Sequence, residues 1–308
     1  MLKNNSKTPY LSKSAGLLYL KSLGVNIPTT YFGLENFTPQ EERELNQHIN
    51  KDLTWIVRFD ASSEIRFLLK GTKINSENMV EEIKNINQHN KAYKGKFKMM
   101  LQCCLNSSVE GVAKLLSDGK ILLETEKNDN GHFVRDGNVP YRYLIAPFET
   151  EVDHPKLTSR NIEKLHSELI KIGQNYVVEW IVTKQDELFI TDAKYVPDSF
   201  LKNIENSHKL IIKEGIACGK INHAINMNKT NHILYLSKTS IEYLPFINNY
   251  TQGIIFESGG LLSHCVVYQA AKNIPMLIGI NADTINEIIN QEVCMELNFT
   301  KDVQIFSL

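Results

Sequence analysis

The stretch from Gly253 to Ile280, GIIFESGGLLSHCVVYQAAKNIPMLIGI, constrains the fold more than any other part of the sequence. It begins and ends with apolar runs, and between them lie Gly259-Gly260, Ser263-His264 and a segment of helical character. Apolar runs bounded by turn residues indicate buried strands, and the segment between them predicts a helix over 263–273. The sequence therefore predicts a strand, a tight turn, a helix and a second strand, with a histidine at the turn.

Ser263 and His264 stand at the start of this predicted helix. A serine in front of a helix caps it by accepting a hydrogen bond from a backbone N–H of the first turn. His264 would then lie where unpaired N–H groups and the helix dipole favour an anion, which suits a histidine that becomes phosphorylated. Gly259 and Gly260 would let the backbone turn sharply. The plainer alternative is a capping serine followed by a surface histidine.

Composition narrows the classes of function. The chain has 308 residues, 42% hydrophobic and 22% charged, which predicts a folded protein of two domains. With 34 Lys and Arg against 35 Asp and Glu, it gives no electrostatic reason to expect a nucleic acid or a membrane as partner. There is no signal-peptide pattern and no apolar run near the ~20 residues of a membrane span. The five cysteines form no CxxC pair, which indicates neither a disulfide framework nor a zinc site and favours the cytoplasm.

Hydrophobic periodicity predicts the elements of the N-terminal part. Apolar residues at helical spacing predict helices over 12–24, 79–86 and 159–173, the last ended by Gly173. Runs rich in β-branched and aromatic residues predict strands over 53–62, 97–105, 111–116, 119–127 and 131–139. A hairpin is predicted over 176–196, with its turn at 184–186.

A polar segment over 197–209 separates this hairpin from a second series of elements. Strands are predicted over 210–225, 231–237, 253–258, 275–280 and 293–299, with helices over 263–273 and 282–290. Strands that alternate with helices are typical of a small α/β domain. We therefore expect one domain over 1–200 and a second over 201–308.

The stretch around His264 resembles the phosphohistidine swivelling domain of the PEP-utilising enzymes, the group that contains PEP synthase, pyruvate phosphate dikinase and rifampin phosphotransferase. Gly259-Gly260, Ser263-His264 and Ile274-Pro275 stand at the places of that family's pattern, and EGIACGKI at 214–221 resembles the segment that opens the domain. Two residues depart from the pattern. Leu262 stands where Thr is usual and Ala270 where Arg is usual, and the usual residues help to hold phosphate.

The first 200 residues resemble, in the same order, the ATP-grasp nucleotide-binding domain of those enzymes. The resemblance implies an α+β ATP-grasp domain followed by a small α/β swivelling domain. It implies nucleotide contacts from Lys13, Arg58, Gln102, Leu105, Glu124 and Lys194. Lys13 and Arg58 would neutralise the triphosphate, Gln102 would lie beside adenine, and residues 128–131 would belong to the loop over the phosphates, which ends at 137–140.

A metal-binding hairpin completes this resemblance. Glu179 and Asp192 match the two metal ligands of the family's hairpin, and Lys194 stands where an arginine is usual. The resemblance implies Mg²⁺, or alternatively Mn²⁺, because hard cations prefer anionic oxygen ligands. Taken singly, each residue has a plainer explanation: Lys13 could be an ordinary first-turn lysine, Arg58 an ion-pair partner, and the two carboxylates the solvated face of a hairpin.

The resemblance implies an ATP-dependent phosphotransferase of the kinase or dikinase type, with His264 and Arg58 as catalytic residues. His264 would take phosphate from ATP, with release of AMP and phosphate, and swivel about 197–209 to an acceptor. The sequence contains no barrel domain for PEP or pyruvate, so we expect a small-molecule acceptor or an acceptor site on a partner protein. The sequence leaves open whether AMP or ADP is released. The alternatives are a subunit of a split PEP synthase-like enzyme and a non-catalytic ATP-binding sensor.

Overall fold

The computed structural model describes residues 13–36, 38–49, 53–61, 69, 72–126, 140–197, 200–201, 210–223, 230–270, 272, 274–298 and 303–307. The chain forms two compact units. The first unit consists of Leu11–Ser108 and Val178–Lys194. Within the part of the chain that the structure describes, the second unit consists of Val109–Val177 and Tyr195–Leu308.

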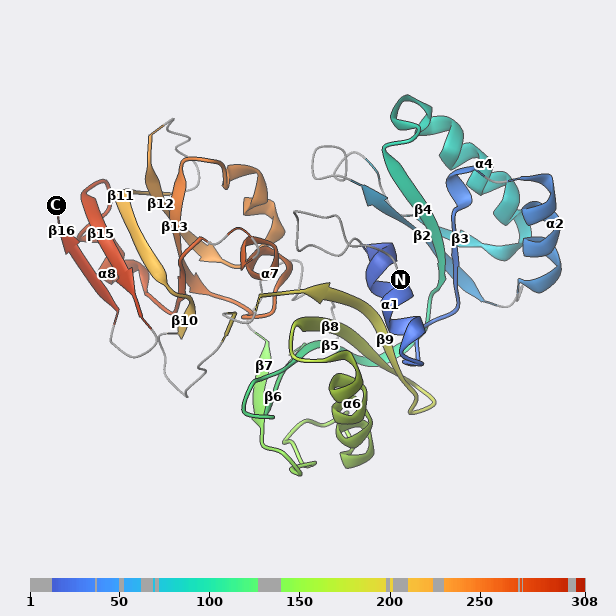
Figure 1. The fold of residues 1–308 in the computed structure, drawn as a ribbon, viewed down its shortest axis with the longest axis horizontal. Coiled ribbons are helices and arrows are strands. Elements are labelled where there is room, and N and C mark those ends of the chain that lie inside the picture. The colour runs from blue at the N-terminus through green and yellow to red at the C-terminus, as the bar shows by residue number, and fades with distance from the viewer. Residues whose placement is uncertain are drawn as a thin grey trace. The chain divides into compact units, whose positions relative to one another are not determined.

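An antiparallel sheet of four strands organises the first unit. Its strands are β1 (Thr30–Phe32), β2 (Thr54–Ala61), β3 (Thr72–Asn75) and β4 (Phe97–Cys103), in the order β1-β4-β2-β3. Its helices are α1 (Lys13–Ser22), α2 (Pro39–His48) and α4 (Met79–His89), with 3₁₀ turns at Leu34–Asn36, Ser76–Asn78 and Lys91–Tyr93. Helix α4 covers one side of this sheet (Figure 1). Its buried Met79 and Ile83 join a core that includes Trp55, Val57 and Met99.

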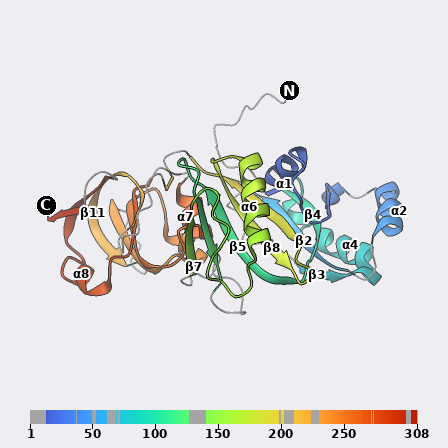
Figure 2. The same cartoon turned by 90° about the horizontal axis from the view of Figure 1, so that it is seen from below.

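A second sheet has the strand order β7-β6-β5-β8-β9. Its strands are β5 (Ser107–Leu115), β6 (Ile121–Thr125), β7 (Tyr141–Ile145), β8 (Tyr176–Thr183) and β9 (Leu188–Tyr195). Helix α6 (Ser159–Ile172) lies beside this sheet in both views (Figures 1 and 2). A capping box at Thr158 starts α6, and Gly173, with φ of 93°, follows its last residue. None of the described helices is long and apolar enough to cross a membrane.

The third sheet, drawn in gold to red in Figure 1, lies in the second unit and has the order β10-β14-β13-β12-β11-β15-β16. Its strands are β10 (Leu210–Lys213), β11 (Gly215–His223), β12 (His232–Lys238), β13 (Thr251–Ser258), β14 (Met276–Ile278), β15 (Glu292–Leu297) and β16 (Gln304–Ser307). Strands β11 to β14 pair in parallel and the outer strands pair antiparallel. The remaining elements are α7 (His264–Ala270), α8 (Ala282–Asn286) and a 3₁₀ turn at Ile241–Phe246.

Both faces of the third sheet are buried. On β12, Leu234 and Leu236 join an apolar core that also contains residues of α7, whereas Ile233 and Tyr235 join a second core. Successive side chains of a strand point to opposite faces, so this division follows from the strand geometry. A parallel sheet is typically covered on both sides, which explains the continuous apolar runs of the sequence.

The mixture of antiparallel sheets, a mixed sheet and helices confirms the expected fold class. The helix expected over 263–273 is α7, which begins at His264 and ends at Ala270, and the helix expected over 282–290 is the shorter α8. The strand expected over 131–139 lies outside the described residues. The domain boundary near residue 200 stays a prediction, since the compact units instead group Val109–Val177 with Tyr195–Leu308.

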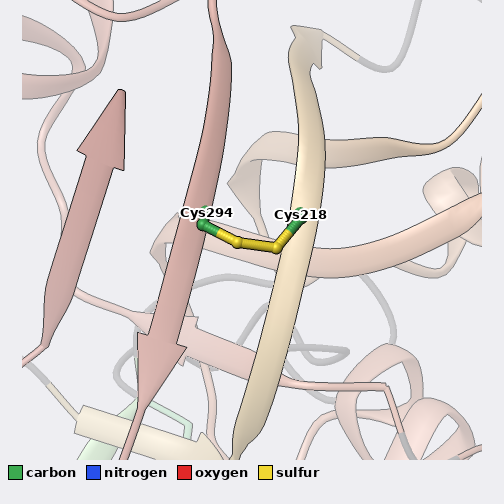
Figure 3. Close-up of a disulfide and its surroundings, with 2 residues drawn as sticks. All are labelled: Cys218 and Cys294. Atoms are coloured by element: carbon green, nitrogen blue, oxygen red, sulfur yellow. A yellow bond between two sulfur atoms is a disulfide. The ribbon is translucent and has the colours of Figure 1, made fainter. Parts of the chain in front are cut away.

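A disulfide joins Cys218 of β11 to Cys294 of β15 (Figure 3). The two residues stand directly opposite each other in this antiparallel pair, and their Cα atoms are 4.1 Å apart. The expectation that the cysteines form no disulfide is therefore wrong. Cysteine spacing could not reveal this pair, because the register of two strands brings together residues that are 76 positions apart.

Candidate functional site

Helix α1 is held against β2 and β9 by close contacts within the first unit. Oδ2 of Asp60 accepts hydrogen bonds from the backbone N–H of Ser14 at 3.3 Å and from the Ser14 hydroxyl at 2.5 Å. Gly16 lies against the backbone carbonyl of Ala193, where a Cβ would collide with the oxygen. Together these contacts place Lys13, the first residue of α1, near the charged side chains of β9.

Lys13, Arg58, Glu179, Asp192 and Lys194 form a charged cluster in the first unit. Nζ of Lys13 lies 3.0 Å from Oδ2 of Asp192. Nζ of Lys194 lies 2.5 Å from Oε1 of Glu179 and 3.9 Å from Oδ2 of Asp192. Asp192 and Lys194 are two residues apart on β9, so their side chains leave the same side of the strand. The structure thus brings together five of the residues that the sequence singled out.

The pKa of Lys13 is lowered from its usual value. Burial is the main cause, because it disfavours the charged ammonium, and the nearby positive charge of Arg58 adds to this effect. The carboxylates of Asp192 and Glu179 act in the opposite direction without cancelling it. Lysines with perturbed pKa values are concentrated at functional sites, where a charge is held in place for a ligand.

Arg58 carries a hydrogen-bond donor that nothing in the described chain satisfies. Its Nε is buried and has no hydrogen-bond partner among the described residues. Buried polar groups are nearly always hydrogen-bonded, so an unsatisfied guanidinium N–H needs an explanation. An anion would satisfy it, because guanidinium groups match the oxygen geometry of phosphates and carboxylates.

Glu179 and Asp192 are suited to hold a divalent cation together with a bound phosphate. Both carboxylates face the ammonium of Lys194, so a positive charge already lies between them. Mg²⁺ is commonly held by one or two carboxylates with phosphate oxygens and water completing the shell. Within the described part of the chain, no group of three or more His, Cys, Asp or Glu side chains could hold a metal ion by itself. The donor set therefore fits a metal that arrives with a nucleotide.

Gln102 and Leu105 lie at and just beyond the end of β4. Gln102 is buried opposite Thr30 of β1 and donates from Nε2 to the Thr30 hydroxyl at 3.4 Å. Leu105 is partly buried and packs against the core of the first sheet. Their role beside adenine stays a prediction.

In the second unit, His264 is the first residue of α7 and is half-buried. The capping role of Ser263 is confirmed, since its hydroxyl accepts from the N–H of Val266 at 3.4 Å. The residue after the histidine does not compete with it as a nucleophile: burial raises the pKa of Cys265 to about 12, so its thiol stays protonated.

We call residues 259–263 the histidine loop. Gly259 has φ of 123°, which favours glycine, and a Cβ there would collide with the side chain and backbone of Thr239. The N–H of Gly260 donates to the Thr239 hydroxyl at 3.1 Å. Gly259 thus allows the loop to turn closely around the end of β12, as the sequence predicts.

Glu124 of β6, predicted as a nucleotide contact, lies beneath the histidine loop. Its side chain is completely buried, and its carboxylate accepts from the N–H groups of Leu261 at 2.9 Å and Leu262 at 3.0 Å. Arg142 of β7, directly opposite Glu124 in the sheet, donates from Nε to Oε1 of Glu124 at 2.8 Å and from Nη2 to the carbonyl of Gly259 at 3.1 Å. No pattern in the sequence pointed to Arg142 apart from its place near Glu124.

Leu262 and Ala270, the departures from the family pattern, are both buried in the apolar core that contains α7. Here they serve packing. Residues 128–131 and 137–139, predicted to cover the phosphates, lie outside the described residues, as does most of the predicted swivel at 197–209.

Residues 228–298 match the family model described as PEP-utilising enzyme, mobile domain. No curated protein matches the chain. Among solved structures, D-alanyl-alanine synthetase A from Vibrio cholerae O1 matches with a TM-score of 0.40 and 13% identity, over 59% of this chain and 54% of that one. N5-carboxyaminoimidazole synthetase from Staphylococcus aureus matches with a TM-score of 0.38 and 10% identity, over 92% and 55%.

The macrocyclase MdnC from Microcystis aeruginosa MRC, bound with its precursor peptide, matches with a TM-score of 0.36 and 12% identity, over 59% of this chain and 51% of that one. The chain spans about half the length of these solved structures, and scores this low do not establish a shared overall fold. The matched segment contains the histidine loop, His264 and α7. Residues 228–298 are therefore similar to the mobile domain of the PEP-utilising enzymes.

Proposed function

We propose that the chain is an ATP-dependent phosphotransferase in which His264 carries the phosphoryl group. The observation that supports this most is the position of His264, which opens α7 directly after its capping serine inside the segment that matches the mobile domain. A half-buried imidazole at this position can be reached by a substrate and can also be carried away from it.

The N-terminal part would be the ATP-grasp domain that binds the nucleotide. Its antiparallel sheets and the charged cluster support this assignment. Lys13, Arg58 and Lys194 would neutralise the triphosphate, and Gln102 and Leu105 would contact the base. The buried, unsatisfied Nε of Arg58 would donate to a phosphate oxygen. Glu179 and Asp192 would hold Mg²⁺ or Mn²⁺, which would stabilise the negative charge that develops on the phosphate oxygens.

The neutral imidazole of His264 would attack the β-phosphorus of ATP. A bond forms between the ring nitrogen and this phosphorus, the bond to the oxygen of the α-phosphate breaks, and AMP leaves with that oxygen and its electron pair. Water would then cleave the outer phosphoryl group, releasing phosphate and leaving phosphohistidine. Arg58 would stabilise the charge of the first transition state.

His264 would next deliver its phosphoryl group to an acceptor. Carrying the group on a swivelling domain separates the two reactions and keeps water and acceptor away from the first one. A small molecule, or a site on a partner protein in the cytoplasm, would be the acceptor.

A second candidate is an ATP-binding sensor without turnover. The burial of Leu262 and Ala270 favours it, because the side chains that usually help to hold phosphate are replaced by apolar groups packed into the core. A sensor would bind ATP through the charged cluster but would not form phosphohistidine.

Labelling with ATP that carries the radiolabel on its β-phosphorus distinguishes the two candidates. Wild type, His264→Ala and the control His89→Ala, which changes an exposed histidine on α4, are incubated with Mg²⁺ and this ATP. We expect acid-labile label on protein and release of AMP from wild type and the control, and neither from His264→Ala. Tight ATP binding without label or AMP would reject the phosphotransferase and favour the sensor.

A further inference from the structure

The carboxylate of Glu124 binds two consecutive backbone N–H groups of the histidine loop. Oε1 of Glu124 accepts from the N–H of Leu261 at 2.9 Å, and Oε2 accepts from the N–H of Leu262 at 3.0 Å. Successive backbone N–H groups of a turn form a concave site for an anion, and here the anion is a side chain of the same chain. The second of these N–H groups lies two residues before His264.

Arg142 completes this arrangement from the neighbouring strand. Its guanidinium binds Oε1 of Glu124 through Nε and the carbonyl of Gly259 through Nη2, at 2.8 and 3.1 Å. One side chain therefore neutralises the buried carboxylate and holds the first residue of the histidine loop. Charge-assisted hydrogen bonds of this kind are the strongest in proteins.

Nearly every backbone N–H group of the histidine loop has a hydrogen-bond partner. The N–H of Gly260 binds Thr239, those of Leu261 and Leu262 bind Glu124, and that of Ser263 binds the carbonyl of Gly260 at 3.4 Å. The side chains of Leu261 and Leu262 are buried in a core shared with β5 and β6. The position of the loop is thus determined jointly by the third sheet and by Glu124 and Arg142 of the second sheet.

We propose that Glu124 and Arg142 are positioning residues that dock the histidine loop and thereby orient His264. With three donors on its carboxylate and no exposed surface, Glu124 serves the loop in this arrangement instead of a nucleotide. The docking itself follows from the contacts, and its effect on catalysis rests on the proposed function. Loss of either residue leaves the charged cluster of the first unit intact but lets the histidine loop move.

Hydrogen–deuterium exchange of the peptide covering 259–264, without nucleotide, tests the docking directly. In Glu124→Gln the isosteric amide presents an N–H where the carboxylate accepted, so we expect exchange at Leu261 and Leu262 to become about tenfold or more faster. Arg142→Gln should also accelerate exchange at Leu261 and Leu262. Because the Arg142 side chain is 31% exposed in wild type, this is the variant to use if Glu124→Gln does not fold.

Asp118→Asn is the matched control. Asp118 pairs with Lys120 in the exposed turn between β5 and β6, so its replacement removes a carboxylate of the same sheet without touching the loop. We expect exchange at 259–264 to remain that of wild type. Unchanged exchange in both Glu124→Gln and Arg142→Gln, or equal acceleration in Asp118→Asn, would overturn the docking.

A second readout separates positioning from nucleotide binding. Both docking variants should bind ATP with wild-type affinity and, if wild type is labelled, should form phospho-His264 at least about tenfold more slowly at saturating ATP. A loss of ATP affinity with unchanged exchange would overturn the docking role and assign Glu124 to the nucleotide. Absence of label on wild type would reject the phosphotransferase alone, because the exchange experiment does not depend on it.

Discussion

The ammonium of Lys13 lies 3.0 Å from the carboxylate of Asp192, whose side chain is 2% exposed. This contact joins the start of α1 to β9 within the charged cluster. It requires α1 to approach β9 closely, which Gly16 allows by having no side chain against the carbonyl of Ala193. The position of the positive charge therefore depends on a glycine three residues further along the same helix.

Replacing Asp192 tests the contribution of this pair to folding. Asp192→Asn leaves the buried ammonium of Lys13 without its nearest carboxylate, so we expect the free energy of unfolding to fall by on the order of 3 kcal/mol. Denaturant unfolding of variant and wild type measures the difference. Lys84→Gln is the control, because the Lys84–Glu42 pair has the similar length of 2.9 Å but is well exposed. Loss of this exposed pair should lower the free energy of unfolding by less than about 1 kcal/mol. Equal losses in Asp192→Asn and Lys84→Gln would show that burial does not determine how much an ion pair contributes.

Arg58→Gln tests whether the unsatisfied guanidinium serves a ligand. Because Nε of Arg58 has no partner in the described chain, its removal should change stability little. Loss of one charged donor to a phosphate should weaken ATP binding by about ten- to a hundredfold. Fluorescent ATP titration measures this. Arg43→Gln, at an exposed position of α2, should bind ATP as wild type does. Loss of stability with unchanged ATP affinity would make Arg58 a structural residue.

The lowered pKa of Lys13 predicts an alkaline loss of ATP affinity. Under the proposed function the ammonium of Lys13 would attract the triphosphate, and this attraction would disappear as pH rises through the lowered pKa, before the ordinary value of 10.5 is reached. The effect on folding has the opposite sign. Between the two pKa values the unfolded chain binds a proton that the folded chain lacks, so this group's contribution to stability increases with pH there.

Lys13→Arg is the decisive control for this pH dependence, because arginine stays charged throughout the range. ATP affinity of wild type should fall between neutral pH and the ordinary lysine pKa, whereas that of Lys13→Arg should stay nearly constant. Lys13→Met should bind weakly at every pH. A parallel fall in wild type and Lys13→Arg would assign the titration to another group.

Local patterns were sufficient to predict the histidine loop. Gly259-Gly260, Ser263 and His264 are neighbours in sequence, so the turn, the cap and the start of α7 are specified by residues within a few positions of one another. The ends of α7 and α8 were predicted less accurately. The described α7 ends at Ala270 and α8 at Asn286, and element boundaries are what an apolar pattern predicts least accurately.

Contacts between distant segments could not be predicted. Glu124 and Leu261 are 137 positions apart, and their hydrogen bond depends on how β6 lies against the loop. Arg142 was missed because its strand, YRYLI, is short and has exposed residues that weaken the apolar pattern. The pairing of Cys218 with Cys294 likewise depends on strand register. The family resemblance supplied Lys13 and Asp192 as site residues but not their contact.

Gly259→Ala tests how closely the histidine loop must turn. The substitution places a methyl group at φ of 123° and within collision distance of Oγ1 and the backbone N of Thr239. We expect a loss of more than about 2 kcal/mol in the free energy of unfolding, from backbone strain and this clash together. Gly33→Ala isolates the strain, because Gly33 has φ of 81° and no heavy atom within 4 Å of the added carbon. It should cost about 1 kcal/mol. Thermal and denaturant unfolding measure both, and equal losses would show that the approach of Thr239 does not constrain the loop.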